Sequence, residues 1–141
     1  MTEEPTTPDL VSLARHGYEA MGRGDIDAVM SVYATDAVLD MSPVGMGTHE
    51  GEEAIRRFVE AWRGSYGADY RYEQEEILVL GHGVMLSVVQ EAGRLAGGKG
   101  LVEQRAAHVA IWANGKIERQ TGYTDIDEGR AAAQRLAEER G

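Results

Sequence analysis

The chain of 141 residues has no cysteine, few basic residues and no long hydrophobic run. Without cysteine, disulfides, thiol nucleophiles and thiolate metal sites are all excluded. Lys and Arg total 14 against 24 Asp and Glu, and the formal net charge is -10. This acidity argues against nucleic acid and anionic membranes as partners, because both are polyanions that recruit basic patches. A membrane span needs about 20 apolar residues, whereas the stretch from Val84 to Val89 is already interrupted by Ser87.

What remains is the composition of one globular domain, with 43% hydrophobic and 27% charged residues. Residues 1–8 contain two prolines and no apolar pattern, so we expect a disordered lead-in followed by a single domain over residues 9–139. The segment Met1–Pro5 lacks the basic start and apolar stretch of a secretory signal, so we expect a cytoplasmic location.

The first half of the chain has the period of helices. Asp9 is the expected N-cap of a helix that stops at residues 22–24, and Asp25 is the expected N-cap of a second helix. A short strand over residues 36–41 and a loop rich in glycine precede a third helix from about Glu52. The three helices carry apolar stripes at helical spacing: Leu10, Leu13, Ala14, Gly17 and Met21; Ile26, Val29, Met30 and Tyr33; Ile55, Phe58, Val59, Trp62 and Tyr66.

The second half changes to the period of strands. Residues 70–80, 84–94, 102–112 and 116–123 are predicted as four strands in a meander. Hairpin turns are expected at residues 81–83 and at Asn114–Gly115, and residues 96–100 form a longer loop. Asp125 or Asp127 is expected to open a last, alanine-rich helix that runs towards Glu139.

This order of elements predicts an α+β fold. Three N-terminal helices would pack on a strongly curved antiparallel sheet and leave a cone-shaped hollow, with one short C-terminal helix beyond the sheet. The opposite face of the sheet, with Val109, Ile111 and Tyr123, is also fairly apolar. We therefore expect a homodimer formed through the sheet.

Three segments of the chain resemble the nuclear transport factor 2-like superfamily, and within it the SnoaL-like family. They are Gly24–Val29 with Tyr33–Val38, then His49–Phe58, and finally Val102–Arg105 with His108–Val109 and Asn114–Ile117. The resemblance covers residues 9 to 139. It implies a cystatin-like cone with a pocket between helices and sheet, commonly in a dimer. The superfamily includes isomerases, cyclases, hydrolases, dehydratases and pure binding domains, so the fold alone does not fix the activity.

Compared with ketosteroid isomerase, a member of the superfamily, the chain keeps only part of the active-site pattern. The position of the acid that stabilises the oxyanion falls on His108. The position of the base falls on Met41 or on Ser42, depending on the register, and the second choice turns Asp40 inward. The family tyrosine falls on Gly17, next to Tyr18, so the isomerase triad is not reproduced.

We therefore expect Asp40 and His108 to be the catalytic candidates, Asp40 as base and His108 as the donor to enolate charge. The expected substrate-binding residues are Tyr18, Trp62, Gln90, Met41 and Gln120. Structural alternatives remain open: His108 as a core histidine, Asp40 as a cap of the turn before Pro43, Tyr18 in the core or at the rim, and at least one of the glutamines facing solvent.

The four histidines are scattered, so we expect no metal site and no cofactor. The leading hypothesis is proton transfer next to a carbonyl of a small apolar or aromatic molecule: isomerisation, aldol-type cyclisation or dehydration. The alternatives are a non-catalytic carrier or sensor and a dimeric protein-interaction module.

Overall fold

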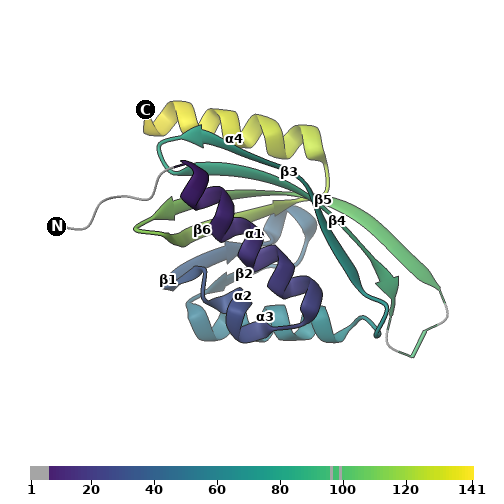
Figure 1. The fold of residues 1–141 in the computed structure, drawn as a ribbon. Helices are drawn as coiled ribbons and strands as arrows, with labels where there is room; N and C mark the ends of the chain where they lie inside the picture. Colours follow the sequence, from purple (N-terminus) through teal and green to yellow (C-terminus); the bar gives the residue numbers. More distant parts are fainter. Residues whose placement is uncertain (1–6, 96, 99) are drawn as a thin grey trace.

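The computed structural model describes residues 7–95, 97, 98 and 100–141 (Figure 1). The helices are α1 (Thr7–Arg23), α2 (Ile26–Met30), α3 (Glu52–Gly64) and α4 (Ile126–Arg140), with a short 3-10 turn η1 (Ser42–Val44). The strands are β1 (Tyr33–Asp40), β2 (Thr48–Glu50), β3 (Arg71–Gly81), β4 (Val84–Arg94), β5 (Leu101–Ala113) and β6 (Lys116–Tyr123). None of the described helices is long and apolar enough to cross a membrane.

The described strands form one sheet in the order β2-β1-β6-β5-β4-β3. Strands β3 to β6 make the expected antiparallel meander, but β1 pairs with β6 in parallel. The sheet is therefore mixed, which corrects the prediction of an antiparallel sheet. Strand β2 was not predicted at all; it pairs with the end of β1, from Val38↔Glu50 to Asp40↔Thr48.

Several element ends lie where the sequence placed them. Asp25 caps α2 by accepting from the amide of Ala28, and Asp125 caps α4 by accepting from that of Glu128. Asn114 and Gly115 have φ of 53° and 77°, as expected for a tight hairpin turn.

Other element ends were wrong. The first helix begins at Thr7 rather than Asp9, so it takes in the end of the predicted lead-in; residues 1–6 lie outside the described residues. The last helix has 15 residues and is not short.

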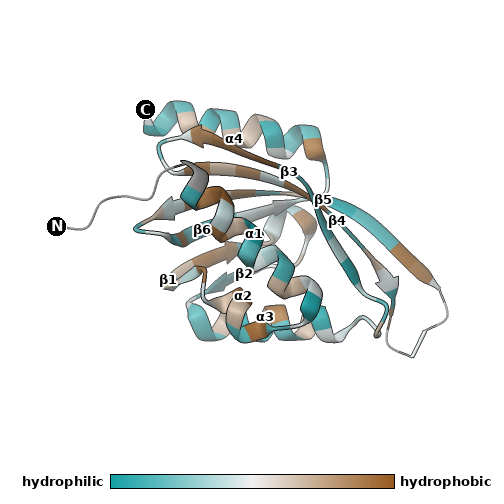
Figure 2. Cartoon of the chain, viewed as in Figure 1, coloured by the Kyte–Doolittle hydropathy of each residue, from teal (hydrophilic) through white to brown (hydrophobic). Residues whose placement is uncertain are grey.

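Helices cover both faces of the sheet. Helices α1, α2 and α3 cover one face, while α4 packs on the other face of β4 and β5 (Figure 1). The apolar residues under α4 include Val84, Leu86, Val109 and Tyr123. In Figure 2, α3 and α4 alternate hydrophilic and hydrophobic bands, as helices do that bury one side. Much of the face expected to form a dimer is thus covered by α4 of the same chain.

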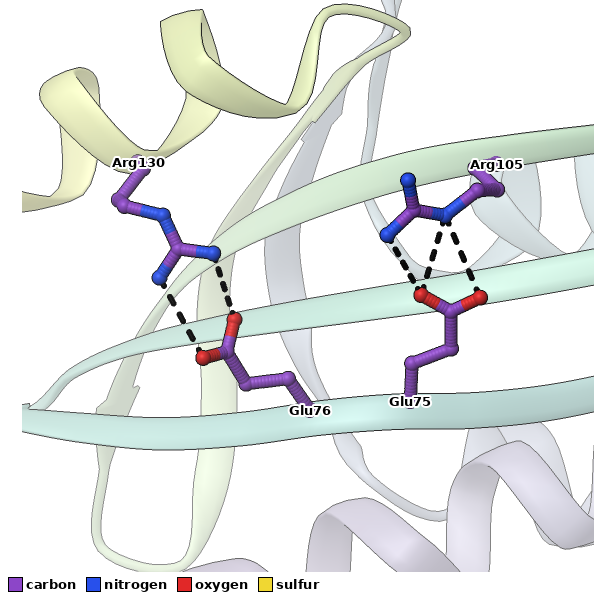
Figure 3. Close-up of polar contacts among 4 residues, drawn as sticks. All are labelled: Glu75, Glu76, Arg105 and Arg130. Atoms are coloured by element: carbon purple, nitrogen blue, oxygen red, sulfur yellow. Dashed lines mark hydrogen bonds and ion pairs between the residues drawn. The ribbon is translucent and has the colours of Figure 1, made fainter.

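The face of the sheet on which α4 packs, called the outer face below, also holds two ion pairs (Figure 3). Glu75 accepts from Arg105 of β5 and Glu76 accepts from Arg130 of α4, at closest distances of 2.6 and 2.8 Å. The β3–β4 register shifts between Gln74 and Glu76, a bulge that accompanies the pairing of two consecutive glutamates with arginines.

Candidate functional site

A cavity of about 240 Å³ lies between the sheet and helices α1, α2 and α3. Most of its wall is apolar, with methionines, valines and aromatic rings from both halves of the chain. This is just below the roughly 300–1,000 Å³ typical of ligand pockets, so the cavity suits a small occupant. Its polar groups lie in two places, one at the middle of β5 and one towards the far end of β4.

The first polar place is the pair formed by His108 and Tyr18. The hydroxyl of Tyr18, on α1, lies 3.3 Å from Nδ1 of His108, on β5. Among the described residues, this is the one hydrogen-bond partner of His108. Across the sheet His108 lies between Ser87 of β4 and Gly122 of β6. The second ring nitrogen is therefore left for a ligand or for water.

Burial sets the protonation of this pair. It lowers the pKa of His108 from 6.5 to about 4, so the imidazole is neutral at pH 7. Burial also raises the pKa of Tyr18 to about 12, although hydrogen bonding to Ser87 opposes the shift. Both groups are therefore uncharged, and either can donate or accept a hydrogen bond.

Gln120 is fixed nearby by a tyrosine of β1. The Tyr33 hydroxyl donates to Oε1 of Gln120 over 2.9 Å. Burial, followed by the nearby Tyr18, raises the pKa of Tyr33 above its usual range, so the hydroxyl keeps its proton. This orients the Gln120 amide with its NH₂ group free of that bond.

The second polar place is centred on Glu91 of β4, which is only 6% exposed. Its Oε2 accepts from Trp62 Nε1 at 3.0 Å and from the Tyr70 hydroxyl at 2.8 Å. Its Oε1 accepts from Nε2 of Gln104 on β5. Tyr72 and Gln104 are the cross-strand neighbours of Glu91, and all three residues line the cavity.

A run of aromatic rings joins the two places. From His108 it passes through Tyr18, Tyr72, Tyr70, Tyr66 and Trp62 to Phe58, with ring centroids 4.7 to 6.3 Å apart. Such contacts add rigidity to the wall beyond the area they bury.

A comparison with protein families decides the identity of the fold. The SnoaL-like domain family matches residues 14–120, most of the chain. The chain belongs to this family. No curated protein matches the chain. The family lies in the nuclear transport factor 2-like superfamily, as the sequence segments indicated.

Solved structures with the same fold support this assignment. A nuclear transport factor 2-like protein of unknown function from Burkholderia pseudomallei is 21% identical, with a TM-score of 0.66 over 85% of this chain and 93% of its own. An LEH-like epoxide hydrolase from M. tuberculosis is 19% identical, with a TM-score of 0.70 over 93% of each chain. TerC, co-crystallised with polyporic acid, is 16% identical, with a TM-score of 0.69 over 89% of this chain and 98% of its own.

Most of the predicted site residues line the cavity of this SnoaL-like domain: Tyr18, Met41, Trp62, His108 and Gln120. Gly122 leaves the space that the Met41 side chain occupies, because a Cβ on that glycine would lie 2.7 Å from the Met41 Sδ. Of the two registers considered for β1, the structure has the one that turns Leu39 and Met41 inward.

Asp40 does not line the cavity, so the register that turns it inward is not the one in the structure. Its Oδ1 accepts from the backbone amide and hydroxyl of Ser42 and from Thr48, and its Oδ2 pairs with Arg119 at 2.9 Å. Asp40 pairs with Thr121 of β6, and Thr121 pairs with Val109 of β5. Paired residues share a face and Val109 packs under α4, so Asp40 is on the α4 face of the sheet. Hydrogen bonds from Ser42, then from Thr48, lower its pKa, with Arg119 adding to the effect. Asp40 is thus the cap of the turn before Pro43.

Gln90 also lies outside the cavity lining. On β4 it alternates with Glu91 and sits between Glu73 and Arg105, whose side chain joins the ion pairs of the outer face. Among the described residues, no three histidine, aspartate or glutamate side chains gather where they could hold a metal.

Sequence reasoning missed Glu91 and Tyr72. Strand β4 is buried on both of its faces from Val84 to Val89, so its pattern did not reveal which face Glu91 takes. The one available signal was that Glu91 is the first carboxylate after this apolar run.

Proposed function

We propose that this SnoaL-like domain binds a small, flat, largely apolar molecule in the cavity, with a polar oxygen of the molecule at His108 and Tyr18. The observation that carries the proposal is the pair itself: two neutral, half-buried hydrogen-bonding groups at the wall of a largely apolar cavity. Burying a polar group without a hydrogen-bond partner is costly. A ligand oxygen that bonds the free imidazole nitrogen removes that cost.

The cavity wall supports an aromatic or similarly flat body for the molecule. Phe58, Trp62 and Tyr72 line it with methionines 21, 41 and 85, which adapt their shape readily. The structural neighbours that include TerC with polyporic acid and an epoxide hydrolase are consistent with a small-molecule site in this fold.

A second candidate function is proton transfer next to a carbonyl of the bound molecule. It is favoured by the neutral state of His108, which can donate its N–H to a developing enolate oxygen while Tyr18 holds the other nitrogen. Asp40 lies outside the cavity, so the proton removed next to the carbonyl would pass to Glu91, the carboxylate that lines it. A carrier or sensor function needs the same contacts without turnover.

The test is thermal unfolding against a panel of planar enones, phenols and polyketide-like aromatics. A ligand at about 100 times its Kd stabilises the fold by roughly 2.7 kcal/mol, a rise of several degrees in Tm. We expect a hit with wild type that weakens in His108→Ala and in Tyr18→Phe. His16→Ala is the matched control, because His16 is exposed on α1 and has no role in the cavity.

The outcomes separate the candidates. Ligand stabilisation that persists in His108→Ala would contradict the proposed contact. If a hit also turns over, and turnover falls in His108→Ala more than binding does, proton transfer is supported. Binding without turnover of any compound in the panel supports the carrier or sensor.

A further inference from the structure

The Glu91 end of the cavity holds a buried carboxylate that has no charged partner among the described residues. The carboxylate is buried, yet it forms no ion pair with any described residue. Arg63 contacts the same cluster but lies over the Tyr70 ring, 4.3 Å from its centroid, and donates to the Met21 carbonyl instead. Buried charges in proteins are normally paired, so Glu91 is an exception that calls for an explanation.

The hydrogen-bonding sites that remain at this end are acceptors. Trp62, Tyr70 and Gln104 donate to Glu91, and the Tyr66 hydroxyl is also hydrogen-bonded to it, so neutral groups surround the carboxylate. Gln104 gives its NH₂ group to Glu91 and to the Tyr66 hydroxyl, so its amide oxygen is left without a described donor. A ligand group at this end therefore has to donate.

The surroundings favour a donor that is positively charged. Trp62 and Tyr72 line the cavity beside Glu91, and aromatic rings attract cations through their electron-rich faces. A cation at Glu91 would neutralise the buried carboxylate, which a hydroxyl would not. The net charge of -10 also raises the local concentration of cationic molecules.

We propose that the ligand carries a protonated amine at the end of its apolar body away from His108, and that this amine binds Glu91 and the amide oxygen of Gln104. The proposal rests on the proposed function, because it assumes a small apolar molecule in the same cavity. Glu91 lies four residues along β4 from Ser87, the partner of His108. At about 3.3 Å per residue this is about 13 Å between backbone positions. The two polar groups of the ligand thus lie at opposite ends of a flat body.

The test uses three probes with one body: 2-naphthylmethylamine, 2-naphthylmethanol and 2-ethylnaphthalene. Their Kd values come from protein NMR titrations of wild type, Glu91→Gln and Glu103→Gln. The last is the matched control, since Glu103 carries the same charge one residue from Gln104 but is exposed. We expect the amine to bind wild type at least tenfold more tightly than the ethyl compound, with the alcohol in between. This preference should vanish in Glu91→Gln and persist in Glu103→Gln.

Equal affinity of the amine and the ethyl compound for wild type would overturn the amine proposal and leave the apolar pocket standing. No binding of any probe would overturn both. A preference for the amine that survives Glu91→Gln would assign it to surface charge and overturn the proposal.

A further measurement needs only wild type, in case Glu91→Gln fails to fold. We expect intermolecular NOEs from the methylene group of the bound amine to the Trp62 and Tyr72 rings. Contacts to the Tyr18 and His108 rings instead would place the amine at the wrong end and contradict the proposal.

Discussion

Asp40 and Glu91 are both carboxylates on strands of the same sheet, but they lie on opposite faces of it. Asp40 is held by Ser42, Thr48 and the guanidinium of Arg119, on the face that α4 covers. Glu91 is held by neutral donors only, at the wall of the cavity. The family's base position is thus occupied by Met41, its neighbour Asp40 is a structural cap, and the carboxylate in the cavity lies on another strand.

The difference shows that strand register decides which acidic residue can meet a ligand. Side chains alternate between faces, so a shift of one residue exchanges Asp40 for Met41. In this chain Leu39 and Met41 face the cavity, and the acid at the end of β1 is turned away.

Of the substitutions that test this difference between the two carboxylates, Glu91→Ala is expected to have the largest effect, a loss of folding stability. It leaves the Trp62, Tyr70 and Gln104 donors without their acceptor, and each buried donor left unpaired costs about 1–3 kcal/mol. We expect the free energy of unfolding to fall by about 3 kcal/mol and Tm by roughly 10 °C. Urea unfolding measures this, with Glu103→Ala as control; a loss under about 1 kcal/mol would show that the donors find water instead.

The next effect is a pH dependence that belongs to the cavity. Because the pKa of His108 is about 4 in the folded state and 6.5 ordinarily, the unfolded chain takes up a proton first as the pH falls. Stability from the neutral imidazole is thus complete above pH 6.5 and is lost between pH 6.5 and 4, by at most about 3 kcal/mol. We expect wild type to lose stability over this window more steeply than His108→Gln. Parallel curves for the two proteins would mean that His108 titrates normally.

A smaller effect is expected for Asp40→Asn, which removes the charge that pairs with Arg119 and keeps an acceptor for Ser42. We expect a loss of about 1 kcal/mol at pH 7 and unchanged ligand affinity. The pKa of Asp40 is lowered in the folded state, so its contribution is present above the ordinary value of 3.8 and fades as the pH falls below it. Impaired ligand binding by this variant would return Asp40 to the site.

The sequence predicted those parts of the fold that depend on local chemistry. Asp25 and Asp125 cap helices, and Asn114–Gly115 turns a hairpin, because each acts on backbone groups a few residues away. The parallel pairing of β1 with β6 joins segments some 80 residues apart, so local pattern does not contain it. Strand β2 has three residues, none of them apolar, and exists through its pairing with β1.

The sequence predicted site residues correctly where the neighbouring residues left one choice of face. His108 has alanines on either side of it along the inward face of β5, and Tyr18 flanks the apolar face of α1, so both residues reach the cavity wall. Gln90 and Glu91 are adjacent on β4, which is buried on both faces, so alternation there did not tell which one faces inward.

The most direct test of the central claim is to map a bound ligand on the two faces of the sheet. Backbone amide shifts would be followed by NMR while a hit from the panel is titrated into wild type. We predict that the shifts concentrate at Tyr18, Glu91, Gln104 and His108, with Thr48 and Arg119 unmoved. Shifts centred on Asp40, Thr48 and Arg119, with the cavity residues silent, would contradict the account.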